Sequence, residues 1–251
     1  MPRGRCHFAL LAALHERFHR ECPEAAALAD AHTPDLLAGT CAPDGLRFVG
    51  KRGKFATHFY SDDRRDTWGR SVAGLFGSHP DLADPTRLSG ADVAMMLGYI
   101  SHLTVDEAFR DEVTVHVYGI EDWRPIIMGL WSMVDGFGIG NASYMAAIHR
   151  FGRKDSVGFI DCGVVGEYLD LVKPWALEDD PWELERIFLR LRRCDTPEHE
   201  ARRTWERNVA MAAPFLDDAR RMRFHRAAVD GGMEETLRYL KGNYALQKRG
   251  G

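Results

Sequence analysis

The sequence lacks the marks of a disulfide-stabilised, a signal-bearing or a membrane-spanning chain. Its five cysteines are scattered singly, without a C-x-x-C pair, so a disulfide framework explains them poorly and we expect reduced thiols. The longest apolar runs, such as residues 93–100, fall well short of the ~20 residues that a membrane span requires. Charged residues and histidines between positions 15 and 20 interrupt any signal-peptide core. The expected location is the cytoplasm.

An excess of positive charge is also missing, as are several common catalytic motifs. The formal net charge is −4, which disfavours a protein that wraps nucleic acid and favours a small-molecule partner. No G-x-x-x-x-G-K-S/T phosphate loop, G-x-S-x-G elbow or H-E-x-x-H helix occurs. Nucleotide hydrolases, serine hydrolases and common metalloproteases are therefore not the leading candidates.

Helical periodicity dominates what is present. Phe8, Leu11, Leu14 and Phe18 recur at helical spacing and predict a helix over 7–22, closed by a proline at position 23. A short helix is expected to begin at residue 33, capped by the threonine hydroxyl there, and to end before the glycine at 39. Residues 40–63 are dense in turn-forming residues, which predicts an irregular segment of the kind that often holds sites.

The longest apolar-periodic stretch spans about 91–116, and Ser89 with Asp92 offers it an N-terminal cap. Residues 113–118 are rich in β-branched side chains, but no second alternating run gives them a partner strand, so we expect them to be helical. Further helices are predicted at 68–78, 122–137, 142–151, 161–172, 180–194, 197–228 and 232–247.

The predicted fold is all-α, a multi-helix single domain over residues 1–251. Residues 1–152 form its site-bearing core and 153–251 a C-terminal helical layer. The charge-rich faces of that layer are most simply solvated surfaces, with a protein partner as the alternative.

Histidines gather in the N-terminal half: eight of the eleven lie in the first 116 residues. His102 and Asp106 are four residues apart on the predicted central helix, so both side chains leave one face and can reach one metal ion. An imidazole with a carboxylate suits zinc, although an exposed ion pair has the same spacing. His15 and His19 also share a helix face, but His7 lies three turns from His19, so the two cannot serve one compact site.

Four segments occur in an order that resembles the zinc-dependent phospholipase C family. They are H-F-A-L-L from residue 7, G-T-C-A-P-D from 39, T-H-F-Y from 57 and G-Y-I-S-H-L-T-V-D from 98. In that family an early histidine, the aspartate of a G-x-x-x-P-D turn, the histidine of an H-F-Y segment and a helical H-x-x-x-D pair converge on metal. The resemblance covers roughly residues 1–115 and implies a helical bundle like that of phospholipase C and P1 nuclease.

Carried over by position, the resemblance implies that Asp44, His58, His102 and Asp106 hold one zinc ion, and that His7 with a shared Asp106 helps to hold a second. A bound divalent cation lowers the pKa of its water to about 7, and a carboxylate such as Asp44 can take the proton. The implied activity is hydrolysis of a small phosphoester or related ester.

The sequence departs from the family pattern just after the helical aspartate. Where the family has a further histidine, this chain has Arg110, Asp111 and Glu112, and no clear H-x-x-x-E follows. His116 or His149 could substitute, or each could be an ordinary histidine. The expected metal content is therefore one or two zinc ions, or none.

Three residues are candidates for substrate binding. Arg110 lies one helical turn beyond the aspartate at 106, where it could pair with that carboxylate, bind an anionic group of a substrate or remain a surface arginine. Tyr60 and Asp62 follow the H-F-Y histidine and could line the same cavity, although the aspartate could instead cap the next helix.

Two other functions compete with the metal-dependent hydrolase. In the first, Asp44 and His58 act without metal as general base and acid in a tailoring enzyme of secondary metabolism, expelling sulfate or phosphate by intramolecular displacement, as in an aziridine-forming cyclase of azinomycin type. In the second, the chain is a degenerate scaffold that binds a partner through its C-terminal helices.

Overall fold

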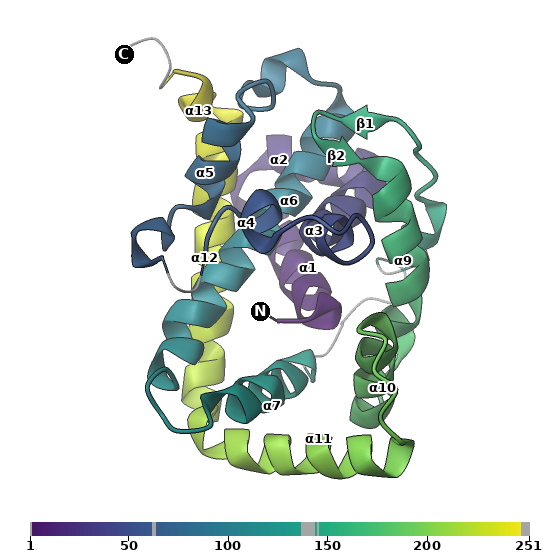
Figure 1. Ribbon diagram of the computed structural model, residues 1–251. Helices are drawn as coiled ribbons and strands as arrows, with labels where there is room; N and C mark the ends of the chain where they lie inside the picture. The colour runs from purple at the N-terminus through teal and green to yellow at the C-terminus, as the bar shows by residue number, and fades with distance from the viewer. Residues whose placement is uncertain (1, 62–63, 137–143, 145, 247–251) are drawn as a thin grey trace.

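The computed structural model describes residues 2–61, 64–136, 144 and 146–246, and over these residues the fold is all-α, as predicted. The only strands in these ranges form a short antiparallel hairpin of β1 (Ser156–Val157) and β2 (Ile160–Asp161). No helix among the same residues is both long and apolar enough to cross a membrane. The chain begins in the middle of the molecule, between helices that arise far apart in the sequence (Figure 1).

The first helix, α1 (Gly4–Glu21), confirms the N-terminal helix expected from its apolar spacing. Its apolar stripe, including Phe8 and Phe18, is fully buried. Pro23 follows the end of α1 and occupies the first position of α2 (Pro23–Ala31), where its missing N–H has no helical partner to lose. The proline therefore ends one helix and begins the next.

The following helix, α3 (Thr33–Phe48), corrects two predictions. The helix does not stop before Gly39, and residues 40–48 are helical rather than irregular, with Pro43 and Asp44 inside the helix. The Thr33 hydroxyl does not cap it either, because that hydroxyl donates to Ala29 O (2.9 Å) in the preceding helix. Beyond α3, the short helix α4 (Lys54–His58) is followed by Phe59, whose backbone is left-handed (φ 59°).

Gly39 is a packing residue rather than a helix terminator. A Cβ atom added at Gly39 would lie 2.0 Å from Met95 O, and one added at Gly98 would lie 2.0 Å from Leu36 O. Both glycines thus let the backbones of α3 and α6 (Gly90–Glu112) approach more closely than any side chain would permit. This contact holds Asp44 beside the central helix.

Helix α6 begins with the predicted capping box. Ser89 accepts from Asp92 N (3.2 Å), and the Asp92 carboxylate accepts from Ser89 N (3.3 Å). The helix is buried along most of its length, and residues 114–116 continue as a 3-10 turn, η3 (Thr114–His116), rather than as a strand. Helix α5 (Ser71–Ser78) packs against α6.

The remaining helices enclose this centre. They are α7 (Trp123–Asp135), α9 (Cys162–Leu177), α10 (Pro181–Leu191), α11 (Glu198–Ala212), α12 (Asp218–Leu240) and α13 (Asn243–Leu246). Short 3-10 turns are η1 (Arg65–Thr67), η2 (Pro85–Arg87), η4 (Ala147–Arg150) and η5 (Ala213–Phe215). Helix α12 packs along α6, and α11 packs against α7 (Figure 1).

The C-terminal helices begin and end at other residues than predicted. The helix expected over 197–228 is interrupted at η5, which contains Pro214, and a new helix starts where Asp217 accepts from Arg220 N (2.7 Å). The break expected between 228 and 232 is wrong, since α12 is continuous from Asp218 to Leu240. The helix expected over 142–151 lies partly outside the described residues, and its end is the turn η4. The division into a core and a C-terminal layer stays a prediction.

Candidate metal centre

Five side chains proposed from the sequence meet inside the molecule. Helix α1 contributes His7, α3 contributes Asp44, α4 contributes His58, and α6 contributes both His102 and Asp106. All are buried: Asp44 is 6% exposed and the other four are at most 1% exposed. The structure thus brings together residues separated by up to 99 positions in the chain.

Two histidines turn the same ring nitrogen toward each other. His102 Nδ1 donates to Thr40 O (2.8 Å), which leaves the lone pair on Nε2. The Thr57 hydroxyl is hydrogen-bonded to His58 Nδ1 (2.7 Å), which directs Nε2 of that ring inward as well. The two Nε2 atoms are 3.3 Å apart. This separation suits either a proton shared by the two rings or a cation bound by both.

Asp44 and Asp106 bring carboxylate oxygens to the same place. His58 Nε2 is 3.6 Å from Asp44 Oδ1 and 3.8 Å from Asp106 Oδ2, and His102 Nε2 is 3.8 Å from that same Asp106 oxygen. Zinc binds its ligands at about 2.0–2.2 Å in a tetrahedron, whose corners are then roughly 3.4 Å apart. The distances from His58 Nε2 to the other three ligand atoms, and from His102 Nε2 to Asp106 Oδ2, are 3.3 to 3.8 Å and suit such an ion.

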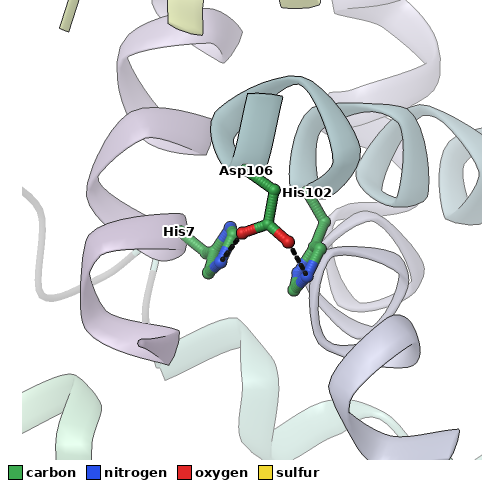
Figure 2. A group of neighbouring side chains, drawn as sticks. All are labelled: His7, His102 and Asp106. Atoms are coloured by element: carbon green, nitrogen blue, oxygen red, sulfur yellow. Dashed lines mark ion pairs between the residues drawn. The ribbon is translucent and has the colours of Figure 1, made fainter. Parts of the chain in front are cut away.

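His7 lies beside His102 at the Asp106 carboxylate. Figure 2 shows the two imidazoles next to each other with one carboxylate oxygen directed at each, His7 on α1 and His102 on α6. His7 Nε2 lies 3.5 Å from Asp106 Oδ1, while the other carboxylate oxygen faces His102. The rings of His7 and His102 stack with their centroids 3.8 Å apart. The two groups of possible ligands, His7–His102–Asp106 and Asp44–His58–His102, share His102.

Burial sets the protonation of the centre. Desolvation lowers the pKa of His7, His58 and His102 below the ordinary histidine value, so the rings are neutral and retain a lone pair. Desolvation also raises the pKa of Asp106 to about 6, with the histidine at 58 acting against that rise. At neutral pH the centre therefore presents three neutral imidazoles and an ionised carboxylate.

Several atoms of the centre that could bind a metal ion have no hydrogen-bond partner among the described residues. These atoms are His7 Nε2, Asp44 Oδ1 and Asp106 Oδ1. Leaving a buried polar atom unsatisfied costs about 1–3 kcal/mol, and more for a charged group. One cation bound by Asp44 and a second bound by His7 and Asp106 would satisfy these atoms, and the mixture of imidazole and carboxylate suits zinc. The residues present therefore fit a metal ion.

The three candidate substrate-binding residues have three different outcomes in the structure. The Tyr60 hydroxyl donates to Asp106 Oδ2 (3.4 Å), which places it at the centre. Arg110 is 3% exposed and pairs with Asp111 (2.9 Å) rather than with Asp106, and its guanidinium lies over the ring of Trp68. Asp62 lies outside the described residues.

Two cavities adjoin the centre, one beside each carboxylate. A cavity of about 250 Å³ is lined by Asp44 together with aromatic side chains and the cations Arg47 and Lys54. A second, of about 290 Å³, is lined by Asp106, Tyr60 and Arg110. Trp131 and Arg192 line both. A small molecule could thus reach either carboxylate from a basic, aromatic-walled space.

The two substitute histidines do not join the centre. His116 and His149 are both exposed and belong to none of the ligand groups found in the described part of the chain. Sequence reasoning missed Thr40 and Thr57, which orient the two imidazoles, because a backbone carbonyl and a single hydroxyl have no motif of their own. Only the placement of α3 and α4 against α6 reveals them.

Comparison with protein-family models, with curated proteins and with solved structures found no match. The class that the fold and site define is an all-α protein with buried histidine and aspartate groups that can hold a metal ion. The resemblance to the zinc-dependent phospholipase C family stays a prediction from four short segments.

Proposed function

We propose that this protein is a metal-dependent hydrolase of a small phosphoester or a related ester, with zinc as its metal. The observation that carries the proposal is the convergence of His58 Nε2 and His102 Nε2, 3.3 Å apart, with two carboxylates. Asp44, His58, His102 and Asp106 would hold one ion, and His7 with Asp106 would take part in holding a second. When bound, zinc supplies a water of lowered pKa and stabilises negative charge on a phosphoryl oxygen.

Asp44 is the proposed general base. It is the most exposed of the five residues and lines the first cavity, so its carboxylate can accept a proton from a water that enters there. His58 Nε2 lies 3.6 Å from this carboxylate, and the ring is itself oriented by Thr57. Tyr60 is placed to orient Asp106 from the second cavity.

Arg110 is the proposed anion-binding residue. Its Nε and Nη2 atoms are occupied by Asp111, at 2.9 and 3.1 Å, whereas the buried Nη1 has no hydrogen-bond partner among the described residues. The side chain lines the second cavity together with Asp106. A phosphate or sulfate oxygen in that cavity would satisfy Nη1 and would bring the ester beside the centre.

A second candidate chemistry uses the same residues without metal. Asp44 lines a cavity and His58 lies against it, so the pair could act as base and acid in an intramolecular displacement that expels sulfate or phosphate, as in an aziridine-forming cyclase. A cytoplasmic location and a partner on the C-terminal helices stay predictions alongside either chemistry.

Metal analysis and hydrolysis assays on the purified chain test the proposal. We expect one or two zinc ions per chain and hydrolysis of p-nitrophenyl phosphate or its bis ester. Asp44→Asn should lower kcat by about 10²–10⁴-fold, the usual contribution of a general base. Asp170→Asn is the matched control, because that side chain is 70% exposed and outside the centre, and it should leave kcat unchanged.

Chelation separates the two chemistries. Loss of activity on chelation, restored by zinc, supports the hydrolase. Turnover that survives chelation but not Asp44→Asn supports metal-free acid and base catalysis. If Ala at both Asp44 and His58 leaves the protein's function intact, neither chemistry stands and a binding scaffold is favoured.

A further inference from the structure

A second group of potential metal ligands lies on the surface, away from the buried centre. It is made of His15 and His19 on α1 and Asp30 on α2. His15 stands eight residues after His7, which is roughly 12 Å along the helix axis. The group therefore shares a helix with the buried centre but none of its ligands.

The helical hairpin of α1 and α2 fixes the geometry of this group. His15 and His19 are four residues apart on α1, and their rings lie nearly parallel with centroids 5.2 Å apart. Both direct Nε2 at the same oxygen, Asp30 Oδ1, at 2.9 and 3.3 Å. The three ligand atoms all lie within 4.8 Å of one another.

The surroundings suit an exchangeable ion. The side chains of His19 and Asp30 are both 53% exposed, whereas that of His15 is 11% exposed. A hollow of about 340 Å³ adjoins the three residues and leaves room for water ligands. Desolvation lowers the pKa of His15, which keeps that imidazole neutral at physiological pH.

We propose that His15, His19 and Asp30 form a second, solvent-accessible site for a borderline divalent cation such as Zn²⁺. Two imidazoles and one carboxylate are ligands for zinc, nickel or copper rather than for magnesium or calcium, which prefer sets of oxygen ligands. An ion there would tie α1 to α2 across the turn at Cys22. The proposal is independent of the proposed hydrolase activity.

Zinc titration of the full chain, followed by release to a colorimetric chelator, tests this site. We expect a rapidly released class of one zinc per chain, distinct from slowly released buried zinc. His19→Ala should weaken the rapid class by at least about tenfold, because even the loss of a residue that only supports a ligand costs 10–100-fold. Asp30→Asn, which preserves the shape of the side chain, should do the same.

His199→Ala is the matched control, since His199 is also a helical histidine and its side chain is 72% exposed. This variant should still bind one rapidly released zinc ion per chain. The proposal is overturned if the wild-type chain has no rapid class, or if His19→Ala binds it as tightly as His199→Ala does. A chain without buried zinc that still shows the rapid class would count against the hydrolase while supporting this site.

Discussion

The imidazoles of the buried centre are oriented by groups that are not themselves metal ligands. Thr40 offers a carbonyl to His102, so that ring carries its hydrogen on Nδ1, and the Thr57 hydroxyl is hydrogen-bonded to His58 Nδ1. Both rings therefore direct Nε2 inward. The Tyr99 hydroxyl donates to Thr57 O, which adds a further contact behind this pair. The chemical character of the site thus depends on hydrogen bonds one layer outside it.

At the scale of single residues, the role of Arg110 in anion binding can be tested by substitution. Arg110→Gln should weaken the binding of inorganic phosphate by about 10–100-fold, because a hydrogen bond to a charged group contributes about 1.5–3 kcal/mol. Arg124→Gln is the comparison, since that arginine lines the same cavity but is exposed, and it should change the affinity less than threefold. Calorimetric titration of phosphate measures both. Equal losses in the two variants would contradict the special role of Arg110.

The sequence predicted which residues lie together where the residue type itself, a histidine or an aspartate, carries the chemistry. His7, Asp44, His58, His102 and Asp106 were selected on an ordered set of short segments, and the structure brings them together. It was uninformative about the buried Nη1 of Arg110 and the paired cavities, because those arise from Trp131, Arg192 and other side chains on distant helices. Such surroundings exist only after folding.

At the scale of elements, the close contact of α3 with α6 positions most of the centre. Asp44 comes from α3, and His102 and Asp106 come from α6, while Gly39 and Gly98 let the two backbones touch. A local pattern cannot separate a glycine that ends a helix from one that packs against a neighbour. For this reason the boundary expected at Gly39 was wrong, whereas the cap at Ser89, a purely local feature, was right.

Gly98→Ala tests the contact. The new Cβ would lie 2.0 Å from Leu36 O and 2.7 Å from Thr40 N, so the helices must separate, and we expect a loss of about 1–3 kcal/mol in the free energy of unfolding. Gly77→Ala is the matched control, because it lies in α5 with nothing within 4 Å of the new Cβ and should stabilise by about 0.5–1 kcal/mol. Urea denaturation compares the two. A neutral Gly98→Ala would show that this contact does not constrain the fold.

At the scale of the whole molecule, the centre exists only in the folded chain. Its five residues lie on four helices between positions 7 and 106, so the unfolded chain cannot present them together. Whatever binds them adds its binding free energy to the stability of the fold, about 2.7 kcal/mol when the free ligand is at 100 times its Kd. Zinc should therefore raise the melting temperature of the metal-free protein.

The size of that stabilisation should depend on pH through Asp106. Burial raises the pKa of Asp106 to about 6, so in the metal-free folded chain this carboxyl is mostly protonated at pH 5 and ionised at pH 7. Burial also lowers the pKa values of the three histidines, so protons compete with zinc for these rings less than for free imidazoles. A cation must displace the proton from the carboxyl at the lower pH, so zinc affinity should be about tenfold lower at pH 5 than at pH 7.

In the metal-free chain, Asp106 makes the stability of the fold change with pH in the opposite direction. Because the folded pKa of Asp106 lies above the unfolded value, this group favours folding less as the pH rises from about 4 to 6, and bound zinc offsets that loss. The melting temperatures of the zinc-loaded and metal-free proteins should therefore diverge between pH 5 and pH 7. In Asp106→Asn, which cannot ionise, the difference should be smaller and independent of pH across that range. A zinc-induced shift that is equally large at pH 5 and pH 7 in the wild-type chain would remove Asp106 from the set of metal ligands.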